Sequence, residues 1–543
     1  DPLTQSIDKD QQKAETLVRD LVKAVNTAAE DDRVTSIVLD LNYMVGGSLS
    51  KLQEIGEALR AFKQSGKSIY AISDAYSQEQ YYLASYADEI AVHPMGAVIL
   101  TGYGSYRNYF KSALEKLSLN MHVFRVGEYK DAVEPYLRNQ MSDASREHNS
   151  QWLNELWASY TDDVELQREL SAGAINDYIN NLDQHLETQK GNPAQTAKAL
   201  SLVDHLFSYH QQRDFLIEKF GKDEELDDYQ ALDYESYLAF IQREEKPAAD
   251  KVGLIVAKGV ILDGEQPEGS IGSDTLSQLI RDARQDESIK AIVMRVDSGG
   301  GSAFASEVIR QELELTRQEG IPIIVSMGSV AASGGYWISM AADEVWATPN
   351  TITGSIGVFS AFPTIEKSLE KVGINTDGVG TTELAGALRL DRPLSPLTQN
   401  ILQQSVNSIY QQFLDLVANA RQTSSAQIHA VAQGRVWTGR AAVDLGLVDK
   451  LGNLNETIAA AADLAELTNY QVFEVEKQLS PSEQLARQLA GELASISNIS
   501  LSQSSPLLSL FTSAEAQFRP LLKLLQSGDP RSVYAQCLEC AAP

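Results

Sequence analysis

The chain has 543 residues, 43% of them apolar, which is enough to build two or three globular domains with sizeable cores. Its formal net charge of −29 excludes nucleic acid as an expected partner, because a surface of that sign repels phosphates. No apolar run approaches the roughly 18–20 residues that a membrane-spanning helix requires.

Two stretches of the chain, about 255 residues apart, read as copies of one another. The apolar run 37–41 parallels 292–296, and the Ala-Asp-Glu triplet at 87–89 recurs at 342–344. The copies are long enough to be whole domains. We therefore predict a first repeat domain over 1–245, a second over 250–470, and a helical or partly disordered tail over 471–543.

Within each repeat, short apolar strands alternate with amphipathic helices. This alternation predicts an α/β fold with right-handed crossovers and mostly parallel sheets. The first strand of the second repeat has no counterpart in the first, so we expect the first domain to lack its opening strand. The elements predicted in the second repeat are a strand at 252–262, a helix around 276–283, a strand at 289–296, a helix at 304–318 and a strand at 321–327.

Ser333 is a candidate nucleophile, because it separates a predicted strand from Gly334, Gly335 and a helical run. A serine at such a turn presents its hydroxyl outward, and the N–H groups behind it favour a developing oxyanion. The alternative is a serine that only caps the helix.

A glycine-rich turn at 297–302 follows the strand at 289–296. Because parallel strands end at one edge of a sheet, this turn should lie near Ser333. Gly300 and Gly301 would let a substrate approach their backbone N–H groups closely; the alternative is a flexible surface turn. A phosphate-binding loop is disfavoured, because no Gly-Lys-Ser/Thr sequence follows.

A serine nucleophile needs a base, and none of the seven histidines falls in these loops. Lys130 is the candidate, since it follows an apolar strand and burial would bring its pKa from about 10.4 toward the 7–8 that suits a base. The alternative is an ordinary surface lysine. The repeat places Gln78 opposite Ser333 and the segment ending at Glu383 opposite Lys130, so each repeat is expected to supply half of a dyad.

Cys537 and Cys540 form a Cys-x-x-Cys pair close to the C-terminus. With nothing after them they lack the βαβ context of a redox site, and two ligands cannot close a zinc shell. A tail disulfide or two idle thiols are the remaining alternatives, and no metal or cofactor is expected.

The sequence Ala-Ala-Ser-Gly-Gly-Tyr-Trp at 331–337 resembles the nucleophile motif of the signal peptide peptidase A (protease IV) family in its long tandem-domain form. The similarity continues through 124–135, 353–357 and 436–439. The resemblance implies domains related to Clp protease and crotonase, and a serine endopeptidase. The implied roles are nucleophile for Ser333, general base for Lys130, orientation of the lysine amine for Ser355, and an oxyanion hole from Gly334, Gly300 and Gly301.

One residue departs from the family pattern: Gly299 stands where the family commonly has proline. The loss of proline should loosen the turn by some fraction of about 1 kcal/mol, which leaves the identity of the oxyanion donor open.

The resemblance also implies a biological setting. Substrates would be remnant signal peptides and other apolar, extended peptides. An N-terminal anchor, missing from this chain, would hold the protein in the bacterial inner membrane with the catalytic part on the periplasmic side, and copies would form a homo-oligomeric ring. Two alternatives are a crotonase-like acyl-thioester enzyme, in which Glu79 or Glu383 would act, and a non-catalytic scaffold of a membrane complex.

Overall fold

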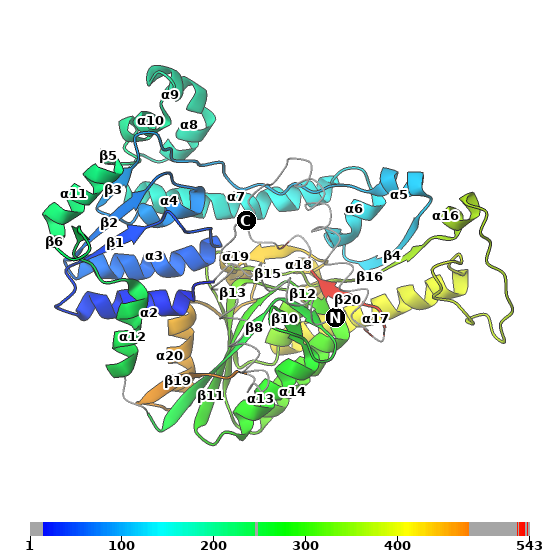
Figure 1. Cartoon of the computed structure of the whole chain (residues 1–543). Coiled ribbons are helices and arrows are strands. Elements are labelled where there is room, and N and C mark those ends of the chain that lie inside the picture. The colour runs from blue at the N-terminus through cyan, green and yellow to red at the C-terminus, as the bar shows by residue number, and fades with distance from the viewer. Residues whose placement is uncertain (1–14, 245–247, 477–528, 530, 538–539, 541–543) are drawn as a thin grey trace. The chain divides into compact units, whose positions relative to one another are not determined.

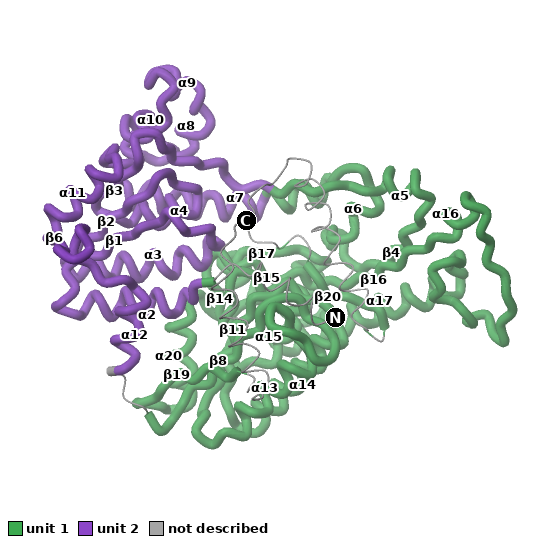
Figure 2. Tube along the Cα trace, in the orientation of Figure 1, with its two compact units in different colours: residues 1–15, 105–150, 248–542 green, residues 16–104, 151–247, 543 purple. Residues whose placement is uncertain are grey.

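The computed structural model describes residues 15–244, 248–476, 529, 531–537 and 540 (Figure 1). The chain divides into two compact units (Figure 2). Unit 1 combines residues 105–150 with the residues from 248 onward, and unit 2 combines 16–104 with 151–247. The units differ from the predicted domains 1–245 and 250–470, because a strand within 105–150 pairs with a strand of the second repeat.

Unit 1 contains an eight-stranded sheet in which most neighbouring strands run parallel. The strands are β8 (Asp250–Lys258), β11 (Ile289–Ser298), β13 (Ile323–Ala332), β14 (Glu344–Ala347), β15 (Ile352–Gly354), β17 (Val436–Thr438), β18 (Lys450–Leu451) and β19 (Tyr470–Glu474). Their order is β17-β15-β13-β11-β8-β19, with β14 and β18 joined beside β13. Because β13 is central in the sheet, its C-terminal end and the next residue, Ser333, lie in the interior of the unit.

A second, six-stranded sheet in unit 1 has the order β10-β9-β12-β20-β16-β4. Its strands are β4 (Asn120–Val126), β9 (Val260–Leu262), β10 (Ser270–Gly272), β12 (Gly300–Ser302), β16 (Val358–Thr364) and β20 (Tyr534–Gln536). This sheet joins parts of the chain that are far apart in sequence, since β4 comes from the first repeat and β20 from the C-terminal tail.

The single strand predicted at 252–262 is wrong, because the chain breaks there into β8 and β9, which belong to different sheets. Gly259 makes the break, with φ at +110°. A Cβ at this position would lie 2.4 Å from the carbonyl oxygen of Gly269. Only glycine fits both this conformation and this contact.

Helices cover both faces of the eight-stranded sheet. On β11, Ile292, Met294 and Val296 share one buried cluster with α13, α14 and α17. Ala291 and Val293, which alternate with them, face a separate cluster formed with α20. Figure 1 shows the strands between these layers. The helices are α13 (Ser273–Gln285), α14 (Ala303–Gln318), α17 (Pro396–Ala420) and α20 (Leu454–Leu464).

The strand predicted at 321–327 is longer in the structure, because β13 continues to Ala332, the residue before Ser333. β11 pairs with β13 from Ile323 to Ala331. On the other side, the first half of β13 pairs with β14 and its end pairs with β15, where Val330 lies opposite Ile352. All ten residues of β13 are buried. The extension therefore delivers Ser333 to a rigid position at the end of a central strand.

Unit 2 is built on a four-stranded parallel sheet of order β1-β2-β3-β5. Short parallel strands joined by helices are what the sequence pattern predicts for this repeat. The elements are β1 (Ser36–Asp40), β2 (Ser68–Ser73), β3 (Glu89–Val92), β5 (His205–Leu206), α2 (Val18–Glu30), α3 (Leu49–Gln64), α4 (Gln78–Ala84) and α11 (Tyr209–Phe220).

The two repeats make the same internal hydrogen bonds. Asp88 accepts from the backbone N–H of Ile69 in the first repeat, and Asp343 accepts from that of Ile323 in the second, both at 2.8 Å. Equivalent bonds of this kind, both partly buried, show that the sequence repeat is a structural repeat. Two tyrosine hydroxyls donate to backbone oxygens in the same way, each at 2.7 Å: Tyr81 to Leu202 and Tyr336 to Leu447.

The predicted tail at 471–543 lies for the most part outside the described residues. Its described residues include the end of β19 and all of β20, which are strands, whereas the sequence predicts a helical or partly disordered tail. Both are held by pairing with distant strands, β19 with β8 and β20 with β12 and β16. In the described part of the chain, no helix is long and apolar enough to cross a membrane.

Candidate active site

Ser333 occupies the turn between β13 and α15 (Gly334–Ser339) and is fully buried. Its backbone is strained, with φ at 56° and ψ at −113°, a conformation that costs a non-glycine residue on the order of 1–3 kcal/mol. A backbone bond of 2.8 Å from its N–H to the oxygen of Gly354 holds it there. The side chain makes no capping hydrogen bond, so the helix-cap alternative is wrong.

Lys130 lies in the turn after β4 and is also fully buried. Because β4 pairs antiparallel with β16, this turn of the first repeat is fastened to strands of the second. The N–H of Tyr129 donates to the oxygen of Gln433 at 2.9 Å. Gly434 packs so tightly that a Cβ on it would lie 2.5 Å from the backbone nitrogen of Lys130. The surface-lysine alternative is therefore wrong.

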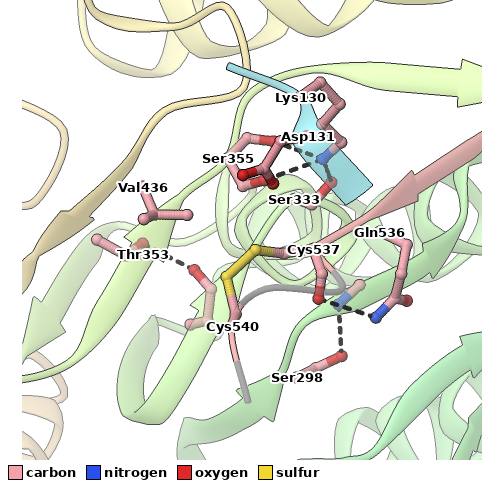
Figure 3. Close-up of a disulfide and its surroundings, with 12 residues drawn as sticks. Lys130, Asp131, Ser298, Ser333, Thr353, Ser355, Val436, Gln536, Cys537 and Cys540 are labelled. Carbon is pink, nitrogen blue, oxygen red and sulfur yellow. Dashed lines mark hydrogen bonds between the residues drawn. A yellow bond between two sulfur atoms is a disulfide. The ribbon is translucent and has the colours of Figure 1, made fainter. Parts of the chain in front are cut away.

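The structure brings the side chains of Lys130, Ser333 and Ser355 together (Figure 3). Lys130 Nζ lies 2.9 Å from Ser333 Oγ and 2.9 Å from Ser355 Oγ, and it donates to the backbone oxygen of Ser355 at 3.2 Å. All three residues are fully buried. Such a cluster can pass a proton between a hydroxyl and an amine without water taking part.

Ser355 is held as firmly as the other two residues. It follows β15, and its backbone adopts a left-handed conformation with φ at 49°. Its N–H donates to the oxygen of Arg435 at 2.6 Å. The neighbouring Gly357 leaves little space, since a Cβ there would lie 3.3 Å from Lys130 Cδ. The lysine side chain is thus confined along its length.

Asp131 anchors the turn that carries Lys130, and sequence reasoning assigned it no role. Its buried carboxylate accepts from Arg107 Nη1 at 3.3 Å and from Asn149 Nδ2 at 3.1 Å, and it also bonds Ser145 Oγ. A buried carboxylate needs partners of this kind to offset its desolvation. Its position next to Lys130 was the only signal that the sequence offered.

His148, on α7 (Asp143–Gln167), braces the same turn from another side. Its Nε2 accepts from the N–H of Val436 at 2.9 Å, and its ring contacts those of Tyr129 and Trp437. Burial lowers the pKa of His148 to about 4. Nε2 must be unprotonated to accept, so this contact exists only with a neutral imidazole.

We expect His148 to make the fold sensitive to mild acid. Its pKa is near 6.5 in the unfolded chain and about 4 in the folded one, so the unfolded state takes up the proton first as pH falls. The contribution of neutral His148 to the free energy of unfolding is therefore fully present above pH 6.5. It falls between pH 6.5 and 4, by up to about 2 kcal/mol from pH 7 to pH 5. Thermal unfolding of wild type and His148→Gln at both pH values measures the effect; equal acid shifts in the two proteins would contradict it.

The glycine-rich turn lies directly against the start of α15. Gly300 has φ at +95°, and a Cβ on it would lie 2.4 Å from the backbone nitrogen of Gly334. The turn is therefore rigid and packed, not a flexible surface turn. The N–H of Gly300 donates to Ser298 Oγ at 3.0 Å, and that hydroxyl donates to the oxygen of Gly259 at 2.6 Å.

The remaining predicted residues lie in different settings. Gln78, the first-repeat counterpart of Ser333, uses its side-chain oxygen to accept from the N–H groups of Thr101 and Gly102. Glu383 is exposed. Cys537 and Cys540 form a disulfide, so the idle-thiol alternative is wrong. Among the described residues, no group of three or more His, Cys, Asp or Glu side chains is placed to hold a metal ion.

Comparisons with known proteins show which family the chain resembles. The model of peptidase family S49 matches the chain twice, over residues 61–216 and 316–468. "Protease 4" from Salmonella typhi is 40% identical over 524 residues, which are 96% of this chain and 84% of that protein. "Serine protease SPPA, chloroplastic" from Arabidopsis thaliana is 30% identical over 473 residues, 86% of this chain and 68% of that protein.

Among solved structures, a mutant ClpP1 from Listeria monocytogenes matches 38% of this chain and 94% of its own length. The sequence identity is 16% and the TM-score 0.26, a likeness too weak to carry an argument.

The two family matches fall one in each repeat, and the relatives cover nearly the whole chain. They confirm the predicted α/β fold with two repeated domains and the resemblance to the signal peptide peptidase A (protease IV) family. They give no support to the acyl-thioester or scaffold alternatives. The chain belongs to peptidase family S49 and is a serine peptidase.

Proposed function

We propose that Ser333 is the nucleophile of this serine peptidase and that Lys130 is its general base. The 2.9 Å contact between Lys130 Nζ and Ser333 Oγ carries the proposal. A neutral amine has two N–H donors and one lone pair. Its donors fit the two oxygens of Ser355, and its lone pair fits the hydroxyl proton of Ser333. Full burial favours the neutral amine, because desolvation penalises the charged form.

The proposed reaction follows from this arrangement. Ser333 Oγ attacks the carbonyl carbon of the scissile peptide bond while its proton moves to Lys130 Nζ. The resulting ammonium gives that proton to the departing amine nitrogen, which leaves an ester on Ser333. Water then attacks the ester, Lys130 accepts the proton of the water, and Oγ regains a proton as the acid product leaves.

The oxyanion of each tetrahedral intermediate needs N–H donors. We assign this role first to Gly334, whose N–H is at the start of α15, directly after the nucleophile. The turn at Gly300 and Gly301 packs against it and is the second proposed source. In this structure the N–H of Gly300 donates to Ser298 Oγ. Gly300 must therefore give up that hydrogen bond before its N–H can donate to the oxyanion.

Ser355 is proposed to hold the amine in place, and its removal should slow the reaction without abolishing it. We expect Ser355→Ala to lower kcat by about 10–100-fold, because the amine loses one of its acceptors and its orientation. KM should change little. Steady-state kinetics, with Ser408→Ala at an exposed serine as a control, measures both constants. A Ser355→Ala enzyme with wild-type kcat would contradict the role.

The proposed substrates are remnant signal peptides and other apolar, extended peptides. The support is the resemblance of the nucleophile motif and its surroundings to the signal peptide peptidase A family, together with the peptidase relatives. An extended peptide can bind at a strand by backbone pairing, with side-chain pockets giving selectivity.

The proposed setting is the bacterial inner membrane, through an N-terminal anchor, with the catalytic part on the periplasmic side. The disulfide Cys537–Cys540 supports an oxidising compartment such as the periplasm. We also propose a homo-oligomeric ring, on the family resemblance alone. Sedimentation of the purified protein tests the ring: a monomer at working concentration would contradict it.

Peptide digestion tests the substrate class. The wild type should cleave an apolar peptide of about 20 residues, a length typical of a membrane segment. A matched peptide with charged residues at every third position should be cleaved at least about tenfold more slowly. Mass spectrometry of the products gives the rates and the cut sites, and Ser333→Ala serves as the blank. Equal rates on both peptides would contradict the substrate class.

A further inference from the structure

A segment from the C-terminal tail lies between two strands of the active-site region. β20 is antiparallel to β12 on one side, with Ala535 opposite Gly301, and antiparallel to β16 on the other, with Tyr534 opposite Phe359. β12 belongs to the turn proposed as part of the oxyanion hole, and β16 begins just after Ser355. β20 therefore occupies the space between the two edges that flank the nucleophile.

Backbone contacts hold this segment as they would hold a bound peptide. The N–H of Cys537 donates to the oxygen of Gly299 at 2.7 Å, and the oxygen of Val533 accepts from Ala303 at 3.2 Å. The oxygen of Ala535 lies where a Cβ on Gly300 would come within 2.0 Å of it. The glycines of this turn thus serve to admit another backbone, which is a common reason for glycine in a strand.

Alternate side chains of the segment enter different pockets. Tyr534 is buried in an apolar cluster that includes Phe359 and also Ala132 and Val133, the second and third residues after Lys130. Val533 and Ala535, on the other face, enter the main core. The pocket of Tyr534 suits a large apolar side chain, and the position of Ala535 suits a small one.

Ser333, Lys130 and Ser355 are among the residues that surround the Cys537–Cys540 disulfide (Figure 3). Cys537 and Cys540 are buried, and Ser333 and Lys130 have no exposed surface at all. A nucleophile that solvent does not reach cannot meet an external substrate in this conformation. Some covering segment has to move. Among the described segments, β20 of the tail lies beside the nucleophile, since a Cβ on Gly334, the residue after Ser333, would lie 3.0 Å from the oxygen of Ala535.

One buried carboxylate anchors the tail at the other end of β20. Asp529 accepts from Ser302 Oγ at 2.7 Å and from the N–H of Phe304 at 3.3 Å. It also accepts from the N–H groups of Arg531 and Val533, which shapes the approach to the strand. The anchor is local to β12 and the start of α14.

We propose that the space between β12 and β16 is the substrate-binding track of this peptidase, and that β20 occupies it as a substrate-like strand. The inference rests on the proposed function of Ser333 and Lys130. Substrate binds in place of β20, extended and antiparallel to both strands. It places a large apolar residue where Tyr534 lies and a small residue where Ala535 lies.

The test uses the full chain with Tyr534→Asp, which puts a charge into the apolar pocket and weakens the docking of β20. Tyr106→Asp, at a tyrosine that is 94% exposed, is the matched control. The readouts are kcat/KM for an extended apolar peptide and inhibition by a synthetic peptide of residues 532–540, oxidised to its disulfide. We expect Tyr534→Asp to raise kcat/KM at least about tenfold, with Tyr106→Asp at the wild-type value. The synthetic peptide should inhibit Tyr534→Asp by raising the apparent KM at constant kcat.

Three outcomes would overturn either this inference or the proposed function. A folded Tyr534→Asp with activity at or below wild type overturns the inference, because β20 then supports the site and does not compete for it. If Tyr534→Asp fails to fold, Asp529→Asn, which weakens only the anchor, carries the same expectation; a rate at or below wild type, or a second failure to fold, overturns the inference. Inactivity of the wild type and all variants would instead contradict the proposed function itself.

Discussion

Ser333→Ala and Lys130→Met are each expected to lower kcat/KM by about 10⁴-fold. Ser333→Ala removes the atom that attacks, and Lys130→Met keeps most of the buried volume but cannot accept the proton. Lys130→Arg should be equally inactive, because a guanidinium stays charged and is no base at working pH. The folded state should survive in all three, since the side chains lie at the end of a rigid strand and in a packed turn.

The double variant tests whether Ser333 and Lys130 act as one unit. If Ser333 and Lys130 act as one unit through their 2.9 Å contact, Ser333→Ala combined with Lys130→Met should be no worse than either single variant. Steady-state kinetics on an apolar peptide ester measures the set, with Lys371→Met as a control at a different lysine. Losses that multiply in the double variant would show that the two residues act independently.

Gly434→Ala is expected to lower kcat/KM by about 100-fold, although Gly434 makes no side-chain contribution to the site. A Cβ there would lie 2.5 Å from the backbone nitrogen and 2.7 Å from the Cα of Lys130. Because these are backbone atoms, the turn that carries Lys130 must shift. A displacement of about 1 Å at a catalytic group is enough for a loss of this size.

Gly446→Ala is the matched control for this prediction. Gly446 has φ at +70° and Gly434 has φ at +85°, so alanine strains both backbones by a similar amount, roughly 1–2 kcal/mol. A Cβ on Gly446 meets nothing within 4 Å. Kinetics and thermal unfolding of both variants separate the two effects. Equal activities in the two variants would contradict the steric account of Gly434.

The parts of the fold that were predictable from sequence are those with a local pattern. The apolar run of β11 and the amphipathic face of α14 fall at the predicted positions. The repeat placed Gln78 opposite Ser333, and this correspondence is the basis for the prediction that each repeat supplies half of a dyad. Ser333 and Lys130 could be proposed as a pair from the sequence because each follows an apolar strand within a recognisable motif, and their side chains meet in the structure.

Features that depend on distant pairing were not predictable in this way. β20 lies in a tail of mixed polar and apolar residues, and it is a strand because β12 and β16 pair with it. The break at Gly259 depends on a contact with Gly269, and the importance of Gly434 depends on Lys130, about 300 residues earlier in the chain. The sequence alone does not show which backbone atoms pack against a given glycine.

Lys130 is proposed to activate Ser333 for attack on a peptide carbonyl. The most direct test is the rate at which Ser333 becomes acylated by an activated apolar peptide ester, followed by intact mass and mapped by digestion. We predict one acyl group on the segment 323–340 of the wild type, and acylation slower by about 10⁴-fold in Lys130→Met. Acylation at another residue, or at the wild-type rate without Lys130, would contradict the claim.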